Sequence, residues 1–129
     1  MYTETLIDHF TNPRNIGTIP NPDGYARVES PGCGDIMELF LKIEDNRIVD
    51  AKYRAFGCAA AIASSSMASV MIKGHTLEEA ARVTDEQIAA ALGGLPDVKL
   101  HCAVMAASAI NVALKNYCAS HDSPICSEL

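Results

Sequence analysis

The middle of the chain alternates between apolar and polar residues in a way that predicts two antiparallel strands. Apolar residues fall on every second position from Asp35 to Ile43, and a similar alternation runs from Ile48 to Phe56. The polar segment EDNR at residues 44–47 separates the two runs, as a hairpin turn would. A shorter run, Tyr25–Glu29, predicts a strand before them. The covered face of the hairpin is expected to hold Met37, Leu39, Leu41, Ile43, Val49, Ala51, Tyr53 and Ala55.

The remaining segments have the periodicity of helices. A short amphipathic helix is expected from Thr3 to Thr11, ended by Pro13. Four helices are expected after the strands, over residues 58–71, 76–82, 84–92 and about 100–117. The first of them is expected to bury Ala59, Ala63, Met67 and Val70. Strands followed by helices predict an α+β fold in one domain over residues 1–129, with a mobile polar tail at 118–129.

Composition and charge exclude several classes of protein. Ten basic and sixteen acidic residues give a net charge of −6 without any Lys/Arg cluster, so we expect no nucleic-acid partner. No apolar signal region follows the first ten residues, and the longest apolar stretch, Cys102–Leu114, is too short to span a bilayer. We therefore expect a cytoplasmic protein without a membrane partner.

Three cysteine-containing segments carry the candidate chemistry. In a reducing compartment, five cysteines favour metal binding or thiol chemistry over disulfides. Cys33 lies two residues before Asp35, and Cys58 stands where the third strand gives way to a helix. The start of the second strand and the end of the third are neighbours in an antiparallel hairpin. Cys33, Asp35 and Cys58 should therefore meet at one end of the sheet.

A third thiol and an imidazole lie at the predicted start of the last helix, at Cys102 and His101, just after Lys99. A helix N-terminus favours the thiolate form of a cysteine. Taken singly, each of these residues also has an ordinary structural interpretation as a small buried thiol or a hydrogen-bonded core histidine. Together they would supply three sulfurs, one nitrogen and one carboxylate oxygen, a set that selects zinc or iron–sulfur species.

Four ordered segments resemble the IscU-like scaffolds of iron–sulfur cluster assembly, which include the NifU N-terminal domain. They are LIDHFTNPRNIG, CGD at Cys33, FGCAAAIASSS at Cys58 and KLHCAVMAASAI around Cys102. The resemblance covers nearly the whole chain, and the VMAASAI segment is more similar to NifU than to the bacterial housekeeping scaffolds. It implies a three-stranded antiparallel sheet with helices packed on one face.

The resemblance also implies roles for the candidate residues. The implied cluster ligands and sulfur acceptors are Cys33, Cys58 and Cys102, with Asp35 and His101 as nearby or exchangeable ligands. The fourth ligand remains open between Asp35, His101 and a cysteine of a partner protein. Lys99 is expected to support a thiolate or persulfide. We predict that Cys102 accepts the first persulfide, because Lys99 and the helix start both favour its thiolate.

The implied function is that of a scaffold, not an enzyme. Such a scaffold accepts sulfur from a pyridoxal-phosphate cysteine desulfurase of the IscS/NifS type, together with iron and electrons from donors. It builds a transient 2Fe-2S cluster and transfers it to apo iron–sulfur proteins. Zinc could fill the same site when iron is scarce.

Two features depart from the family pattern. The family's chaperone-recognition stretch commonly reads Leu-Pro-Pro-Val-Lys, and Asp97 replaces the second proline, so an Hsp70-type chaperone is a doubtful partner. Cys118 and Cys126 match no family ligand and are interpreted as incidental tail thiols, with a redox or metal-binding function as the alternative.

Two other functions compete with the scaffold. The first is a zinc-binding sulfur-transfer protein. The SufU group carries an insertion between the second and third cysteines, for which the short helices between Cys58 and Cys102 leave no room. The second is a zinc hydrolase or deaminase, which needs a positioned general base such as the glutamate of an HxE motif, and none accompanies His101.

Overall fold

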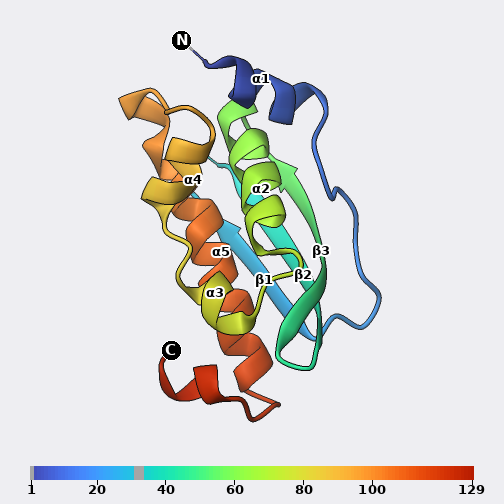
Figure 1. Cartoon of the computed structure of the whole chain (residues 1–129). Coiled ribbons are helices and arrows are strands. Elements are labelled where there is room, and N and C mark those ends of the chain that lie inside the picture. Colours follow the sequence, from blue (N-terminus) through green and yellow to red (C-terminus); the bar gives the residue numbers. More distant parts are fainter. Residues whose placement is uncertain (1, 31–33) are drawn as a thin grey trace.

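A three-stranded antiparallel sheet forms one layer of the molecule, and helices cover one of its faces (Figure 1). The computed structural model describes residues 2–30 and 34–129. The strands, in spatial order, are β1 (Gly24–Glu29), β2 (Ile36–Glu44) and β3 (Arg47–Phe56). The helices are α1 (Glu4–Thr11), α2 (Ala59–Ile72), α3 (Leu77–Ala81), α4 (Asp85–Ala91) and α5 (Leu100–Cys118), with short 3₁₀ turns η1 (Asp97–Lys99) and η2 (Pro124–Ser127). The predicted α+β fold is confirmed.

The β2–β3 hairpin follows the predicted pattern over most of its length. Asp45 and Asn46 form a two-residue turn with φ of 51° and 61°, the left-handed backbone that suits the twist of a tight hairpin. The apolar residues of β2 that were expected in the core are 0–7% exposed: Met37, Leu39, Leu41 and Ile43. The covered face of the sheet is therefore set by the simple alternation along β2.

The prediction for Val49 is wrong. Its side chain is 42% exposed, whereas Ile48 beside it is completely buried. The strand register shifts at this point, because Lys42 pairs with Asp50 while the next residue, Ile43, pairs with Ile48. Val49 is the extra residue of a β-bulge, and the bulge reverses the inward and outward positions of β3 near the turn.

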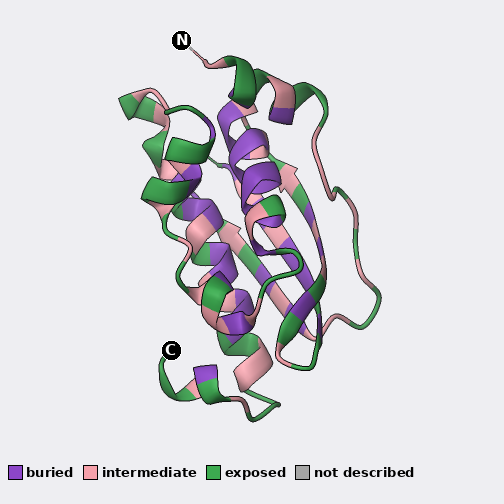
Figure 2. Cartoon of the chain, in the orientation of Figure 1, coloured by how far each residue is buried: buried purple, intermediate pink, exposed green. Residues whose placement is uncertain are grey.

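Helix α2 is buried on almost every side, so the single stripe expected for it is also wrong (Figure 2). Ala63 and Met67 are buried as predicted, but Ala59 is only partly buried and Val70 is 43% exposed. The helix packs mainly against α1, α5 and β3 and also contacts α3 and α4, so little of its surface is left for solvent. Ala, Ser and Met supply side chains small or flexible enough for such close contacts.

A buried polar contact joins α1 and the following loop to α2. Ser66 Oγ accepts a hydrogen bond from the Arg14 backbone N–H at 3.0 Å and lies 2.8 Å from His9 Nδ1. We infer that the Ser66 hydroxyl donates to His9, whose Nδ1 accepts only when the ring is neutral. Burial lowers the pKa of His9 below its usual value, and the positive charge of Arg14 lowers it further. The contact therefore favours an uncharged imidazole.

The later helices begin and end as the sequence predicts. Thr76 and Thr84 both form capping boxes, at the starts of α3 and α4. Helix α5 runs on from η1, and among the described residues the span Asp97–Cys118 is long and apolar enough to cross a membrane by length and composition. Its buried residues pack on the sheet and on α2, and such core helices pass the same test.

The C-terminal segment corrects the interpretation of its two cysteines. Cys118 and Cys126 are bonded to each other in a disulfide, so they are not incidental free thiols. The segment between them turns back from the end of α5 and places η2 beside the domain, with Ile125 only 3% exposed. The expected polar tail thus has a folded path, and its mobility remains a prediction.

The state of His9 predicts how stability depends on pH. An unfolded histidine has a pKa near 6.5, and the folded value lies lower, so below about pH 6.5 the unfolded chain binds more protons than the folded one. The free energy of unfolding should therefore fall as the pH drops below about 6.5. Urea titrations from pH 8 to pH 5 measure this slope.

His9→Gln should flatten that slope, because it removes the buried titrating ring. His121→Gln is the matched control, since His121 is exposed and lies outside the α1–α2 contact. Equal slopes in wild type and His9→Gln would contradict the assignment.

Candidate metal centre

The strand pairing brings Asp35 and Cys58 together, as predicted. Ile36, the first residue of β2, pairs with Phe56, the last residue of β3. Asp35 directly precedes this pair and Cys58 follows it closely, so both lie at the same end of the sheet. The Cys58 backbone N–H lies 3.4 Å from Asp35 Oδ1 and donates to it. Cys58 is also the N-cap residue of α2, which confirms that a helix starts there.

Gly57 makes room for the carboxylate. A Cβ atom built on Gly57 would overlap Asp35 Oδ1 and would lie 2.8 Å from Asp35 Cγ, closer than real contacts allow. Its φ of +155° is also one that other residues rarely adopt. The sequence shows that a glycine precedes Cys58 but not why. The structure gives the reason, because the Asp35 carboxylate lies against Gly57 and leaves no room for a side chain.

The first turn of α5 completes the cluster. Cys102 Sγ lies 3.8 Å from Cys58 Sγ and 3.8 Å from Asp35 Oδ2. His101 Nε2 lies 3.6 Å from Cys102 Sγ and 3.5 Å from Asp35 Oδ2. Asp35, Cys58 and Cys102 form a group whose ligand atoms are all within 4.8 Å of one another. His101 contacts this group on the side of Cys102 and Asp35.

These spacings suit a single tetrahedral ion. Two sulfurs bound at about 2.3 Å with a tetrahedral angle are separated by about 3.8 Å. The two thiol sulfurs already have this separation, 3.8 Å. A sulfur and an imidazole nitrogen on such an ion lie about 3.6 Å apart, and Cys102 and His101 show 3.6 Å. The donor set can thus hold a metal with little movement of these atoms.

Cys33, which the sequence predicts to belong to this group, lies outside the described residues. The described residues on either side of it are held close to Asp35. The Ser30 N–H donates to the Asp35 carbonyl at 2.8 Å, and the Gly34 N–H donates to the Ser30 carbonyl at 3.2 Å.

The positive charge of Lys99 lowers the pKa of the Cys102 thiol, as the sequence suggests, but burial has a larger effect in the opposite direction. Cys102 is completely buried, and burial together with the neighbouring Cys58 raises the pKa of its thiol to about 12. The negative charge of a Cys58 thiolate is the main influence that raises the pKa of Lys99. Lys99 therefore acts mostly on Cys58, and without a metal Cys102 is a protonated thiol.

The centre lies just below the surface. Asp35 is 4% exposed, whereas Cys58 is partly exposed and the His101 side chain is 32% exposed. Three apolar side chains around the start of α5 stand in solvent: Val98, Leu100 and Val104. A small cavity of about 240 Å³ opens beside His101, between β1 and α5. The centre is therefore bordered by exposed apolar side chains and a small cavity.

Comparisons with known proteins show which family this chain is similar to. The profile of the NifU-like N terminal domain matches residues 1–123. The chain is 52% identical over 117 residues to "Iron-sulfur cluster assembly scaffold protein IscU 1" of Archaeoglobus fulgidus, covering 91% of this chain and 76% of that one. It is 46% identical over 120 residues to "Iron-sulfur cluster assembly scaffold protein IscU" of Haemophilus influenzae, covering 90% and 94%. A NifU-like N-terminal structure from Brucella abortus has the same fold, with a TM-score of 0.72, 21% identity and coverage of 92% and 95%.

The contact between Gly57 and Asp35 predicts a specific defect. Gly57→Ala should push the carboxylate out of the ligand group and weaken Co²⁺ binding roughly 10-fold or more. The visible absorption of thiolate-bound Co²⁺ measures this affinity.

Gly94→Ala is the matched control. Gly94 has a φ of +108°, but an added Cβ there meets no atom within 4 Å. Equal Co²⁺ affinities in the two variants would show that the carboxylate does not depend on Gly57.

Proposed function

Because this chain belongs to the NifU-like N-terminal domain family, we propose that it is an iron–sulfur cluster assembly scaffold. The convergence of Asp35, Cys58 and Cys102 on one near-surface position carries this proposal. A 2Fe-2S cluster is the proposed cargo, built there and then passed to apo iron–sulfur proteins. The relatives reported above are named scaffold proteins, which supports the proposal that this chain carries a cluster and is not an enzyme. The cytoplasm is the proposed location.

The proposed ligands of the cargo are Cys33, Cys58 and Cys102, with Asp35 or His101 as the fourth. A hard carboxylate is a poorer partner for an iron–sulfide core than a thiolate. Asp35 in the fourth position would leave one readily exchanged site. His101 lies at nearly the same distance from Cys102 and could take over as the cluster leaves. A ligand from the recipient protein could also enter at this position.

Sulfur is proposed to arrive as a persulfide from a cysteine desulfurase and to be accepted by Cys102. Its sulfur lies within 3.8 Å of Cys58 Sγ, Asp35 Oδ2 and His101 Nε2, so an added sulfur there would sit among the other donors. Once the site opens, the Cys102 thiol loses its proton to water, and the resulting thiolate attacks the outer sulfur of the donor persulfide. One S–S bond forms as the donor's breaks, and the donor leaves as a thiolate. An external electron donor then supplies two electrons to reduce each accepted sulfur to sulfide.

This step requires the site to open. Cys102 is completely buried and protonated in the arrangement described above, so a donor must displace part of its cover. Gly93 and Gly94 have φ of +84° and +108° in the loop before η1 and could allow such a movement. A docked desulfurase is the proposed cause. Asp97 is exposed at η1, and an Hsp70-type chaperone remains a doubtful partner.

Zinc-dependent sulfur transfer is the second candidate. The observation that favours it is the 3.8 Å separation of the Cys58 and Cys102 sulfurs, which suits one tetrahedral zinc ion. On this alternative, zinc is resident and the chain only relays persulfide.

Anaerobic reconstitution separates the two candidates. The full chain is incubated with ferrous iron, cysteine, a reductant and a cysteine desulfurase. A scaffold should develop sulfide-to-iron charge-transfer absorption, contain iron and acid-labile sulfide in equal amounts, and activate an apo-ferredoxin. A colourless protein that retains zinc and still accepts persulfide would establish the relay instead.

Persulfide labelling tests the role of Cys102. After incubation of metal-free protein with desulfurase and cysteine, mass spectrometry should find the added sulfur on the tryptic peptide Leu100–Lys115, which contains Cys102 as its one cysteine. Cys102→Ser should abolish this label, whereas Cys58→Ser should retain most of it. Label confined to the peptides of Cys33 or Cys58 would refute the assignment.

A further inference from the structure

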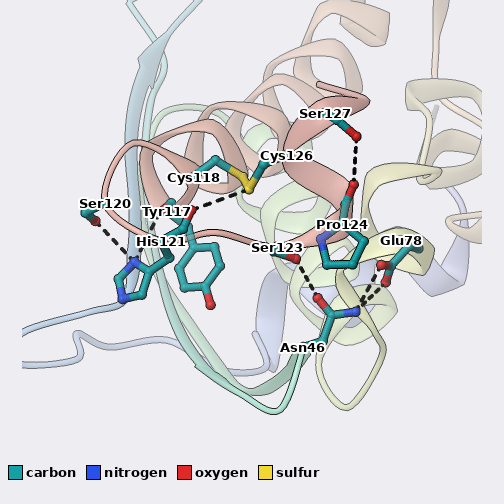
Figure 3. The surroundings of a disulfide bond; sticks show 10 residues. All are labelled: Asn46, Glu78, Tyr117, Cys118, Ser120, His121, Ser123, Pro124, Cys126 and Ser127. Carbon is teal, nitrogen blue, oxygen red and sulfur yellow. Dashed lines mark hydrogen bonds between the residues drawn. A yellow bond between two sulfur atoms is a disulfide. The ribbon is translucent and has the colours of Figure 1, made fainter.

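Two of the five cysteines lie outside the candidate metal centre and are bonded to each other (Figure 3). Cys118 is the last residue of α5, and Cys126 lies in η2. Their Cα atoms are 5.5 Å apart, and the disulfide closes the segment that turns back from the helix end. Both residues are partly exposed, so a small thiol or disulfide can reach the sulfurs.

The disulfide is far from the metal centre. Cys102 and Cys118 lie on the same helix, near its opposite ends. At a rise of 1.5 Å per residue, their separation of sixteen positions in the sequence corresponds to roughly 24 Å. Figure 1 shows the start of α5 and the C-terminus at opposite ends of the molecule. Within one chain, Cys118 and Cys126 therefore cannot ligate the same metal or exchange disulfides directly with Cys58 or Cys102.

Few contacts besides the disulfide hold the C-terminal segment in place. Ile125 is its one buried side chain. The Ser123 hydroxyl donates to Asn46 Oδ1 at 2.8 Å, and Asn46 Nδ2 in turn donates to Glu78 at 2.7 Å (Figure 3). These bonds connect the segment to the β2–β3 turn and to α3. An open cleft of about 450 Å³ remains between the segment, α3 and α5.

We propose that Cys118 and Cys126 form a redox-reversible clasp that fastens the C-terminal segment to the domain. In the disulfide state, the covalent link keeps Ile125 and Ser123 against α3, α5 and the β2–β3 turn. In the dithiol state, three contacts must offset the entropy of ordering the segment: the buried Ile125, the Ser123–Asn46 hydrogen bond, and the stacking and hydrogen bond of His121 on Tyr117. These contacts are too few to do so, and the segment detaches. The stability of this end of the domain thus depends on the reduction potential of the thiols and disulfides in the surrounding solution.

Thiol–disulfide exchange with a small thiol such as glutathione provides the chemistry. A thiolate attacks one sulfur of the pair and forms a mixed disulfide, and the other cysteine leaves as a thiolate. A second glutathione then attacks the mixed disulfide and frees the first cysteine. One protein disulfide and two glutathiones become two protein thiols and one glutathione disulfide, a balanced two-electron exchange.

The sequence makes this clasp easy to observe. Cleavage after Lys and Arg leaves Cys118 and Cys126 together on the peptide Asn116–Leu129. The other three cysteines fall on three different peptides, which contain Cys33, Cys58 and Cys102 respectively. A disulfide within the last peptide is therefore distinguished by mass from every other pairing in the chain.

The test uses the full metal-free chain, equilibrated anaerobically in mixtures of reduced and oxidised glutathione, then alkylated and digested. The Asn116–Leu129 peptide should change from no alkyl groups to two as the mixture becomes more reducing. The Tm measured in the same mixtures should fall by roughly 5–10 °C over this change. Hydrogen exchange over residues 120–129 should become faster at the same point.

The double variant Cys118→Ala/Cys126→Ala is the control, because it keeps the cysteines of the metal centre. Its Tm should not respond to the mixtures. The proposal is overturned if the wild-type peptide carries two free thiols even in oxidised glutathione, or if Cys118 or Cys126 pairs mainly with another cysteine. It is also overturned if the double variant shows the same fall in Tm, or if wild-type reduction changes neither Tm nor exchange.

Discussion

The candidate centre depends on one constraint, the antiparallel pairing that places the start of β2 beside the end of β3. The pairing of Ile36 with Phe56 fixes Asp35 and Cys58 as neighbours, although 23 residues separate them in the chain. Gly57 has no side chain and so allows the Asp35 carboxylate to approach the backbone. The backbone N–H of Cys58 then donates a hydrogen bond that holds the carboxylate in place. Helix α5 adds the second described thiol by packing against the same sheet. A shift of the strand register by one residue would turn Asp35 to the other face of the sheet and separate it from Cys58 and Cys102.

Much of this could be predicted from the sequence because the controlling patterns are local. Strict alternation in β2 sets the covered face, and capping residues at Thr76 and Thr84 set the helix starts. The errors occur where distant contacts override local pattern. Val49 turns outward because of a bulge, and α2 lacks a single apolar stripe because five other elements contact it. The disulfide could not be foreseen, because its pairing depends on how the C-terminal segment folds back.

The site illustrates a conflict between holding a metal and accepting sulfur. A helix N-terminus and a lysine suggest a reactive thiolate at Cys102, but complete burial has the opposite effect and raises its pKa to about 12. Metal binding displaces the proton of a thiol, so a bound ion would reverse this preference without any change in the fold. The same burial that disfavours the free thiolate also excludes water from a bound cluster. A scaffold that must both load and release its cargo needs this cover to be removable.

The two kinds of cysteine occupy opposite electrostatic positions. Cys58 is the N-cap of α2, at the positive end of that helix dipole, while Cys118 is the last residue of α5, at the negative end of its dipole. A disulfide carries no charge and so suits the second position, whereas a metal-bound thiolate suits the first. The length of α5 keeps the two apart, so that a change in thiol potential can act on the C-terminal segment without rearranging the ligand group. The length and direction of α5 therefore keep the Cys118–Cys126 disulfide apart from the Cys58 and Cys102 thiols of the candidate metal centre.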